Sequence, residues 1–315
     1  MNEKNLKMKV AILSGGIGPE REVSIASGKA LAQALQEYYP VSLIDLESPS
    51  LPRVLNPTEQ VVFPVIHGTF GEDGTLQSML EESGFAYAGS GPESSRLCMD
   101  KALAKRAVVE AGVTVSDAIV FQDPTSLNAT EAIEELGSNM ILKPTDQGSS
   151  VALYILNGVD QLRNTLEQLK PGNWMLERRI FGREFTVGVL HGYSLGIVEV
   201  IPNGGVYDYE RKYSAGSTEY RFPAVLPIEL EQKLKAFAAD SFHACNCRDF
   251  ARVDFMISED GHPFFLEVNT LPGLTDTSLL PKSASCSGYD FSSLAKKLVE
   301  PAITRFNEIH LLPAA

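Results

Sequence analysis

The sequence predicts an α/β protein that starts with a parallel sheet and ends in a strand-rich unit. Its 315 residues are enough for two or three domains. Residues 1–97 alternate short apolar strands, such as KVAILSGG and VVFPVIHG, with helical segments such as SIASGKALAQALQEY. This alternation is typical of parallel sheets. Residues 251–269, in contrast, alternate in polarity on both sides of Asp260-Gly261, which predicts a β-hairpin.

Two polar residues of the first unit follow its predicted strands. His67 comes just after VVFPVIHG, and Glu20 lies beyond the first strand at a helix entrance. Ligands of parallel sheets gather at the carboxyl ends of the strands. Each residue also has a plain structural explanation, because a buried histidine is common and an acidic side chain stabilises a helix N-terminus.

The middle of the chain, residues 98–182, contains a possible phosphate-binding loop. We expect an amphipathic helix in CMDKALAKRAVVEAGV that ends at Gly112, and strands in AIVF, MILKP and WMLERRI. Lys143 ends one strand and is followed by Gly148, Ser149 and Ser150. Backbone N–H groups and hydroxyls of such a loop can surround a phosphate beside a lysine charge. The Walker A pattern is absent, and a Gly-Ser-Ser loop alone is most often a simple turn.

The last unit, residues 183–315, contains strands, one long helix in IELEQKLKAFAADSFHA, and a charged aromatic loop at 203–223. Basic and acidic residues balance in this loop, which argues against binding of nucleic acid. The loop is more typical of a flexible lid that covers a binding site.

The predicted hairpin brings acidic groups together. A two-residue turn at Asp260-Gly261 places Asp254 opposite Glu267 and Arg252 opposite Asn269. Facing carboxylates repel each other, and a hard cation such as Mg²⁺ would remove this repulsion. Two alternatives are a hairpin whose outer face is merely polar, and neutralisation of the acids by Arg252.

Composition narrows the class of partners. The net charge of −13 argues against nucleic acid and anionic membranes as main partners. No apolar run reaches the roughly 18 residues of a membrane span, and the N-terminus lacks a signal-peptide core. The cysteines are too few for a disulfide framework, and those of HACNC lack zinc-site spacing, so we expect buried thiols. We therefore expect a cytoplasmic protein.

Seven segments occur in order between residues 15 and 281: GGIGPEREVS, HGTFGEDGTLQ, GSGPESSRLCMDK, KPTDQGSS, YDYERKY, ARVDF and EVNTLPGLTDTSLLP. Together they resemble the D-alanine–D-alanine ligases of the ATP-grasp superfamily. The resemblance implies three α/β domains at 1–97, 98–182 and 183–315, with ATP between the central and C-terminal domains and a lid at 203–223. It also implies a homodimer that joins two D-alanines through an acyl phosphate for peptidoglycan synthesis.

The same resemblance implies roles for individual residues. For ATP these are Lys101 and Lys143 at the phosphates, Ser149 and Ser150 in the covering loop, Glu177 at the adenine amino group, the backbone near Arg178 and Ile180 at the ring, Glu184 at the ribose and Lys212 at the γ-phosphate. Two Mg²⁺ ions, replaceable by Mn²⁺, are implied at Asp254, Glu267 and Asn269. For the D-alanines, the residues are Glu20 and His67 at the first molecule, Arg252 and Gly273 at the oxyanion, Ser278 and Leu279 at the second carboxylate, and Tyr213, which would seal the site through Ser149.

Two features of this pattern bear on specificity. Arg178 stands where the family commonly has lysine, which a backbone contact to adenine tolerates. Tyr213 favours D-alanine over D-lactate as second substrate, since relatives that form the ester replace this tyrosine. The alternatives are a D-alanine–D-lactate ligase, another ATP-grasp ligase with a different acceptor, and an inactive nucleotide-binding module, against which the complete set of acidic and basic site residues argues.

Overall fold

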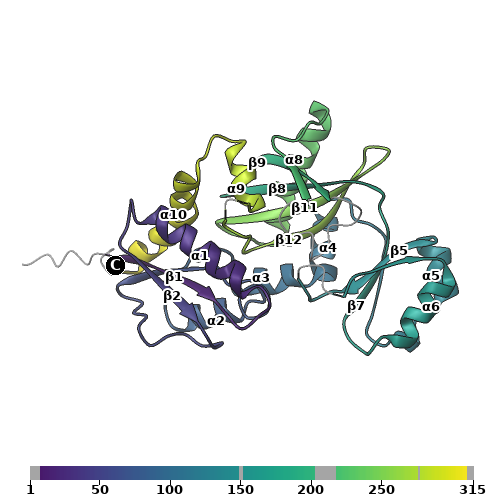
Figure 1. Cartoon of the computed structure of the whole chain (residues 1–315), viewed down its shortest axis with the longest axis horizontal. Coiled ribbons are helices and arrows are strands. Elements are labelled where there is room, and N and C mark those ends of the chain that lie inside the picture. The colour runs from purple at the N-terminus through teal and green to yellow at the C-terminus, as the bar shows by residue number, and fades with distance from the viewer. Residues whose placement is uncertain (1–7, 149–151, 203–217, 276, 311–315) are drawn as a thin grey trace, which may run out of the picture.

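The computed structural model describes residues 8–148, 152–202, 218–275 and 277–310, which form three β-sheets flanked by helices (Figure 1). The expected residues Ser149, Ser150, Lys212 and Tyr213 lie outside this part of the chain. In the described part, no helix combines the length and apolarity needed to cross a membrane.

The N-terminal sheet is parallel, as the sequence predicts. Its strand order is β2 (Val41–Leu46), β1 (Lys9–Gly15) and β3 (Gln60–Pro64), and the helices α1 (Arg21–Leu35) and α2 (Thr75–Glu82) accompany it. The apolar runs form these strands because both of their faces are covered, and nearly every residue of β1 and β3 is buried.

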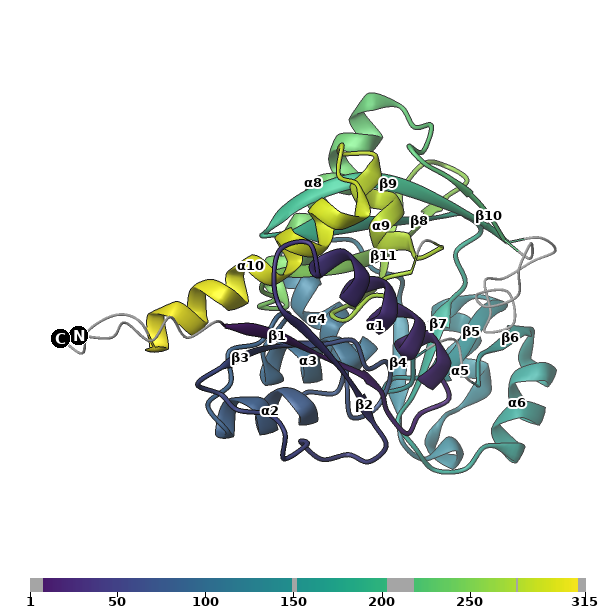
Figure 2. The same ribbon diagram turned by 60° about the vertical axis from the view of Figure 1, so that its left-hand side comes forward.

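The last helix of the chain completes the N-terminal core. α10 (Phe291–His310) lies beside α1 (Figure 2). Its Leu294, Leu298 and Phe306 are buried in one cluster with Val10 and Ile12 of β1. Neither α10 nor β2 was predicted from the sequence. The two ends of the described chain are therefore joined by one hydrophobic core.

One predicted helix is broken in two. The segment CMDKALAKRAVVEAGV contributes to α3 (Pro92–Met99) and α4 (Lys101–Glu110), which meet at Asp100. The Asp100 carboxylate accepts the N–H groups of Ala102 at 2.9 Å and Leu103 at 3.1 Å, so it caps α4. The break places Lys101 in the first turn of a helix, close to the central sheet.

The central sheet is antiparallel, in the order β4 (Ala118–Phe121), β7 (Trp174–Arg178), β5 (Asn139–Pro144) and β6 (Tyr154–Asn157). A short 3₁₀ turn, η1 (Pro124–Ser126), follows β4. The helices α5 (Ala129–Leu136) and α6 (Val159–Gln168) pack together beside this sheet (Figure 1). Their apolar side chains share a core with those of β5 and β7.

The C-terminal sheet is antiparallel, with helices on both faces. Its order is β10 (Thr218–Arg221), β9 (Tyr193–Pro202), β8 (Gly182–Leu190), β11 (Phe250–Ser258) and β12 (Pro263–Asn269). α8 (Ile228–Ala244) shares one core with α4 and the sheet. On the other face lies α9 (Leu279–Ser285), whose Leu280 Cδ1 would be 2.8 Å from a Cβ added to Gly188. Within the predicted lid loop, residues 218–221 form β10.

Three of the four cysteines are buried thiols, in agreement with the expectation. Cys245 and Cys247 follow the end of α8, and Cys247 Sγ lies 3.7 Å from Cys98 Sγ. No disulfide joins them.

The predicted pairing of the hairpin is confirmed, although the predicted two-residue turn is wrong. Ser258 and His262 exchange the hydrogen bonds that close a longer loop, in which Gly261 has φ of 85°. This shifts the register by one residue, and a β-bulge between Asp254 and Phe255 shifts it back. Asp254 therefore pairs with Glu267, and Arg252 with Asn269.

The bulge also changes which side chains share a face. Strict alternation along β12 puts Leu266 opposite to Glu267 and puts Phe265 on the same side as Glu267. In the structure Phe265 is buried in the core, whereas Leu266 and Glu267 both line the same cavity. The prediction for Phe265 and Leu266 is wrong for this reason.

Candidate functional site

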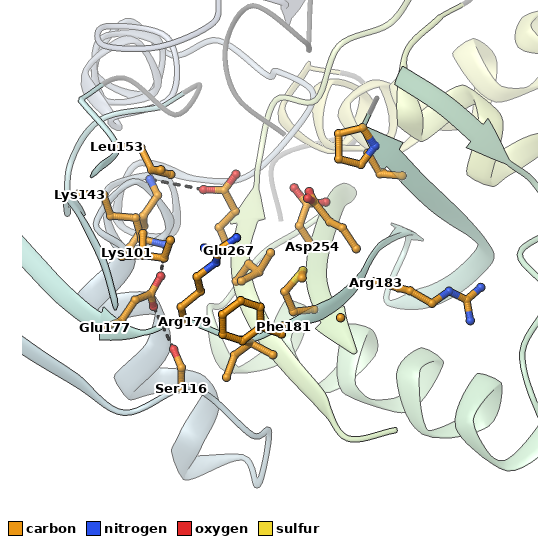
Figure 3. Close-up of a pocket in the computed structure, with 18 of the residues that line it drawn as sticks. Lys101, Ser116, Lys143, Leu153, Glu177, Arg179, Phe181, Arg183, Asp254 and Glu267 are labelled. Atoms are coloured by element: carbon orange, nitrogen blue, oxygen red, sulfur yellow. Dashed lines mark hydrogen bonds and ion pairs between the residues drawn. The ribbon is translucent and has the colours of Figure 1, made fainter. Parts of the chain in front are cut away.

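A cavity of about 440 Å³ lies between the central and C-terminal sheets (Figure 3). β5 and β7 line it from one sheet, and β8, β9, β11 and β12 from the other. The start of α4 adds Lys101. The cavity brings together eight residues that the sequence analysis had singled out: Lys101, Lys143, Glu177, Arg178, Ile180, Glu184, Asp254 and Glu267.

Glu177 is the centre of a buried ion-pair network on the central-sheet side. It lies on β7 and is only 4% exposed. Lys143 Nζ is 2.5 Å from its Oε1, while Lys105 Nζ and the Ser116 hydroxyl both donate to its Oε2. The two ammonium groups outweigh the effect of burial and hold the pKa of Glu177 well below its usual value. Burial lowers the pKa of Lys105.

Lys105 and Ser116 were missed by the sequence analysis. Lys105 lies on α4, one helical turn after Lys101, and Ser116 precedes β4. Lys105 Nζ donates to Ser116 Oγ at 2.8 Å, and both side chains also donate to Glu177. The three residues lie on elements that are distant in sequence. A lysine at a core position of an amphipathic helix was the available signal, because a buried lysine needs a buried anion.

Aromatic and cationic groups also meet at the cavity. The Arg179 guanidinium lies 4.7 Å from the centre of the Phe181 ring, and both residues line the cavity (Figure 3). Arg178, the expected adenine-site neighbour, points its guanidinium instead to Asp117 Oδ2 at 3.0 Å and to the Glu135 carbonyl. The side chain of Arg178 is therefore engaged outside the cavity, and its backbone N–H donates to the Asp117 carbonyl at 3.0 Å.

The two facing carboxylates of the hairpin reach the same cavity, and each is paired with a cation. Arg252 donates to both oxygens of Asp254, at 2.9 and 2.8 Å, and Thr186 and Asn269 donate to the same carboxylate. Glu267 Oε2 is 3.3 Å from Lys101 Nζ. Neutralisation by Arg252, one alternative at the sequence level, thus holds for Asp254 in this structure.

The donor set near the hairpin is chemically suited to a hard cation. Asp254, Glu267 and Asn269 offer carboxylate and amide oxygens, which Mg²⁺ prefers. An ion would have to take an Asp254 oxygen from Arg252, since both are engaged. In the described ranges, no group of three or more His, Cys, Asp or Glu forms a metal cluster. Two carboxylates with an amide and substrate oxygens remain a reasonable coordination shell.

Of the predicted residues that the structure describes, Glu20, His67, Gly273, Ser278 and Leu279 do not line this cavity. Residues 270–275 contact the N-terminal unit, because Leu271 O lies 3.0 Å from Nδ1 of His67, which follows β3, and Leu274 N–H donates to Oγ of Ser27 on α1 at 3.1 Å. Glu20 is adjacent to Gly68, where an added Cβ would be 3.5 Å from Glu20 Oε2.

Ser278 organises this loop from within. Its hydroxyl accepts a hydrogen bond from the Thr275 N–H at 3.0 Å. Ser278 directly precedes Leu279, the first residue of α9. An added Cβ on Gly273 would lie 2.8 Å from Ser278 Oγ, so the two residues are neighbours. Glu20, His67, Gly273, Ser278 and Leu279 are therefore gathered at a second location, which does not line the cavity.

Arg252 connects the two locations. It pairs with Asp254 at the cavity, and its charge adds to the effect of burial in lowering the pKa of His67 and opposes the rise in the pKa of Glu72. Burial is the main cause of the lowered pKa of His67. Since the Leu271 carbonyl can only accept, His67 Nδ1 carries the proton of the neutral ring. Its Nε2 is buried and has no hydrogen-bond partner in the described structure.

Glu72 is a further acidic residue that the sequence analysis did not single out. Burial, with repulsion from Glu20, raises its pKa to about 8. Its Oε2 accepts the Gly68 N–H at 2.6 Å. Glu72 belongs to the segment HGTFGEDG, from which only His67 had been selected. The position of a glutamate within a glycine-rich turn does not reveal whether its side chain is buried.

Comparisons with known proteins match both halves of the chain. A family model described as D-ala D-ala ligase C-terminus matches residues 108–300, and one described as D-ala D-ala ligase N-terminus matches residues 50–90. The D-alanine–D-alanine ligase of Syntrophotalea carbinolica is 39% identical over 300 residues, which cover 94% of this chain and 97% of that protein. That of Aquifex aeolicus is also 39% identical, over 94% of this chain and 100% of the relative.

Solved structures are similar over the same length. A Bacillus anthracis D-alanine–D-alanine ligase complexed with ATP superimposes with a TM-score of 0.83 at 30% identity, covering 96% of this chain and 99% of the other. The VanG D-Ala:D-Ser ligase from Enterococcus faecalis has a TM-score of 0.82 at 27% identity, with 94% and 99% coverage. These similarities confirm the predicted fold class.

Proposed function

This chain belongs to the D-alanine–D-alanine ligase family, and from that membership we propose how its two groups of site residues divide the reaction. The fold is ATP-grasp, and ATP-dependent joining of two D-alanine molecules is the activity of the family. The observation that carries this conclusion is the 39% identity over 94% of the chain.

We propose that the cavity between the two sheets binds ATP. Lys101 and Lys143 supply positive charge for the phosphates. Apolar residues that line the cavity, such as Met256 and Leu266, provide contacts for the adenine base. Glu177 is assigned to the adenine amino group, the backbone at Arg178 and Ile180 to the ring, and Glu184 to the ribose. We also propose that Ser149, Ser150 and Lys212 contact the phosphates, as the family resemblance implies.

Magnesium fits the residues at the hairpin. Asp254, Glu267 and Asn269 would hold two Mg²⁺ ions, or Mn²⁺ in their place, with oxygens from the nucleotide. When bound, the ions would neutralise negative charge on the transferring phosphoryl group. The chain itself already places Lys101 beside Glu267, so a cation is present at this position before any ion binds.

The second group of residues is assigned to the D-alanines. Glu20 binds the ammonium of the first molecule, and His67 lies near its carboxylate. Because His67 Nδ1 already holds a proton, Nε2 donates to a carboxylate only when the ring takes up a second proton. Ser278 and Leu279, at the start of α9, bind the carboxylate of the second molecule through hydroxyl and backbone groups.

The reaction has two steps. A carboxylate oxygen of the first D-alanine attacks the γ-phosphorus of ATP, which gives ADP and an acyl phosphate. The amine of the second D-alanine then attacks the acyl carbon, loses a proton and expels inorganic phosphate. The oxyanion formed in this step needs preorganised donors, which we assign to Arg252 and the Gly273 N–H. Tyr213 and Ser149 are proposed to close the site.

Other expectations remain proposals. We propose domain limits at 1–97, 98–182 and 183–315. The division of the strands into three sheets supports them, although α3 crosses the first limit and β8 begins at Gly182. α10 belongs to the third unit in sequence while packing on the first. A homodimer, a place in the cytoplasm and a role in peptidoglycan precursor synthesis are proposed from the family relationship.

An assay of ADP release with Mg²⁺-ATP tests this function. D-Alanine, L-alanine, D-serine and D-lactate are supplied in parallel, and products are identified by mass spectrometry. We expect ADP and D-alanyl-D-alanine with D-alanine alone, and loss of both on chelation of Mg²⁺. ADP release that depends on another amino or hydroxy acid would indicate the alternative ligases, and tight ATP binding without ADP release would indicate an inactive module.

A further inference from the structure

The Glu177 network contains two lysines with different access to the cavity. Lys143 lines the cavity, whereas Lys105 does not and is only 5% exposed. Each lysine is bound to a different oxygen of the same carboxylate, Lys143 to Oε1 and Lys105 to Oε2. The Ser116 hydroxyl adds a second fixed donor to Oε2 at 2.9 Å.

The charges of this group do not balance. Two ammonium groups surround one carboxylate, and Lys143 is bound only to Glu177 among the described residues. The network therefore has an excess positive charge at the wall of a cavity that we assign to a polyanion. Lys105, in contrast, uses two of its three N–H donors on Glu177 and Ser116, and burial prevents it from reaching a ligand.

We propose that Lys143 and the adenine amino group exchange places on Glu177 Oε1, while Lys105 and Ser116 hold Oε2 throughout. This inference rests on the proposed binding of ATP in the cavity. When the nucleotide enters, Lys143 turns from Glu177 to the phosphates and leaves Oε1 as an acceptor. The 6-amino group of adenine then donates to this oxygen. Base recognition and phosphate binding are thereby coupled through one lysine.

Lys105 is a positioning residue in this scheme. Once Lys143 has left, Lys105 is the remaining cation that keeps a buried carboxylate ionised and correctly oriented. A buried carboxylate without a cation takes up a proton instead. A protonated Glu177 could donate as well as accept, and it would then no longer distinguish adenine from a base with a 6-oxo group. Lys105 therefore sets nucleotide specificity without touching the nucleotide.

The test compares ATP with ITP, whose hypoxanthine carries an oxygen where adenine carries the amino group. In the unmodified enzyme two acceptors, Oε1 and the 6-oxo group, would face each other, so we expect kcat/KM for ATP to exceed that for ITP by at least about 100-fold. In Lys105→Met, we expect kcat/KM for ATP to fall on the order of 10- to 100-fold, mainly through KM. The value for ITP should remain similar or rise.

Two variants complete the experiment. Lys105→Arg keeps the charge and should restore most of the discrimination. Ser116→Ala removes one Oε2 donor without changing any charge, and a smaller loss in the same direction is expected from it even if Lys105→Met does not fold. Equal losses for ATP and ITP in these variants, or an unchanged ratio, would overturn the proposal. Failure of the unmodified enzyme to release ADP with D-alanine would instead contradict the proposed function.

Discussion

Asp254 and Glu267 face each other across neighbouring strands, yet each carboxylate is bound to a cation from the chain itself. Arg252 holds Asp254 through two hydrogen bonds, and Lys101 lies 3.3 Å from Glu267. The register that brings these acids together would be destabilising without such partners. Both cations come from residues assigned to substrate contacts, so a bound nucleotide or ion must compete with them.

This relationship predicts a large loss of turnover on removal of either charge. In Asp254→Asn or Glu267→Gln, we expect kcat to fall by several orders of magnitude, because the transferring phosphoryl group loses its bound cation. The fold should persist, as the strands and the neutral side chains remain. Steady-state kinetics with circular dichroism checks both statements.

A matched control distinguishes charge loss at the site from a general effect of acidic residues. Glu259→Gln removes an exposed carboxylate in the loop of the same hairpin, between β11 and β12, and should retain normal turnover. A near-normal rate in Asp254→Asn would remove this residue from the mechanism.

The hairpin shows how far sequence reasoning reaches. The pairing of Asp254 with Glu267 was predicted correctly, although two errors cancelled. The loop is one residue longer than expected, and a bulge restores the register. Local pattern identifies strands and the Asp-Gly turn, whereas a bulge depends on packing of Phe265 into a core made by distant elements. Alternation of polarity alone could not show on which face of the sheet the Leu266 side chain lies.

The parts of the site that were missed share a physical cause. Lys105 and Ser116 are buried and Glu72 is partly buried, and burial makes charge or hydrogen bonds costly to leave unpaired. Burial arises only when separate elements pack together. The same holds for α10, whose apolar face completes a core begun at residue 10. The motifs that we assign to ligand binding were singled out from the sequence, whereas the residues that hold those motifs in place were not.

Arg179 and Phe181 predict a measurable contribution to nucleotide binding. A guanidinium 4.7 Å from a ring centre gains about 0.5–1 kcal/mol at partly exposed sites, and this pair forms one wall of the cavity. In Arg179→Gln we expect about 2- to 5-fold weaker ATP binding with little change in kcat. Isothermal titration with ATP measures it, and Arg163→Gln on α6 is the matched exposed control. An unchanged affinity would show that the stacked pair serves packing alone.

The choice between amide and ester products predicts a dependence on pH. The amine of the second D-alanine must lose a proton before it attacks, whereas the D-lactate hydroxyl carries no such proton. We therefore expect the share of D-alanyl-D-alanine to rise with pH when D-[14C]alanine competes with D-lactate. Product ratios at pH 6 and pH 8 measure this trend. Equal use of both substrates at both values would contradict it.

Glu72 predicts how stability changes with pH. Burial and repulsion from Glu20 raise its pKa from 4.5 to about 8. Between these values the folded protein holds a proton that the unfolded chain has released, so the contribution of Glu72 to stability falls as pH rises. One pKa unit corresponds to about 1.4 kcal/mol. Because the side chain is only partly buried, we expect a total effect on the order of 2 kcal/mol.

Glu72→Gln should remove this dependence, because glutamine stays neutral at every pH. Its unfolding temperature relative to that of the unmodified protein should therefore increase steadily from pH 5 to pH 8.5. Glu82→Gln is the control, since Glu82 lies at the end of α2 in an exposed position and its replacement should leave the pH profile unchanged. If Glu72→Gln and the unmodified protein follow parallel profiles, Glu72 is ionised in the folded state. The repulsion from Glu20 would then be offset by Arg252, whose charge opposes the rise in the pKa of Glu72.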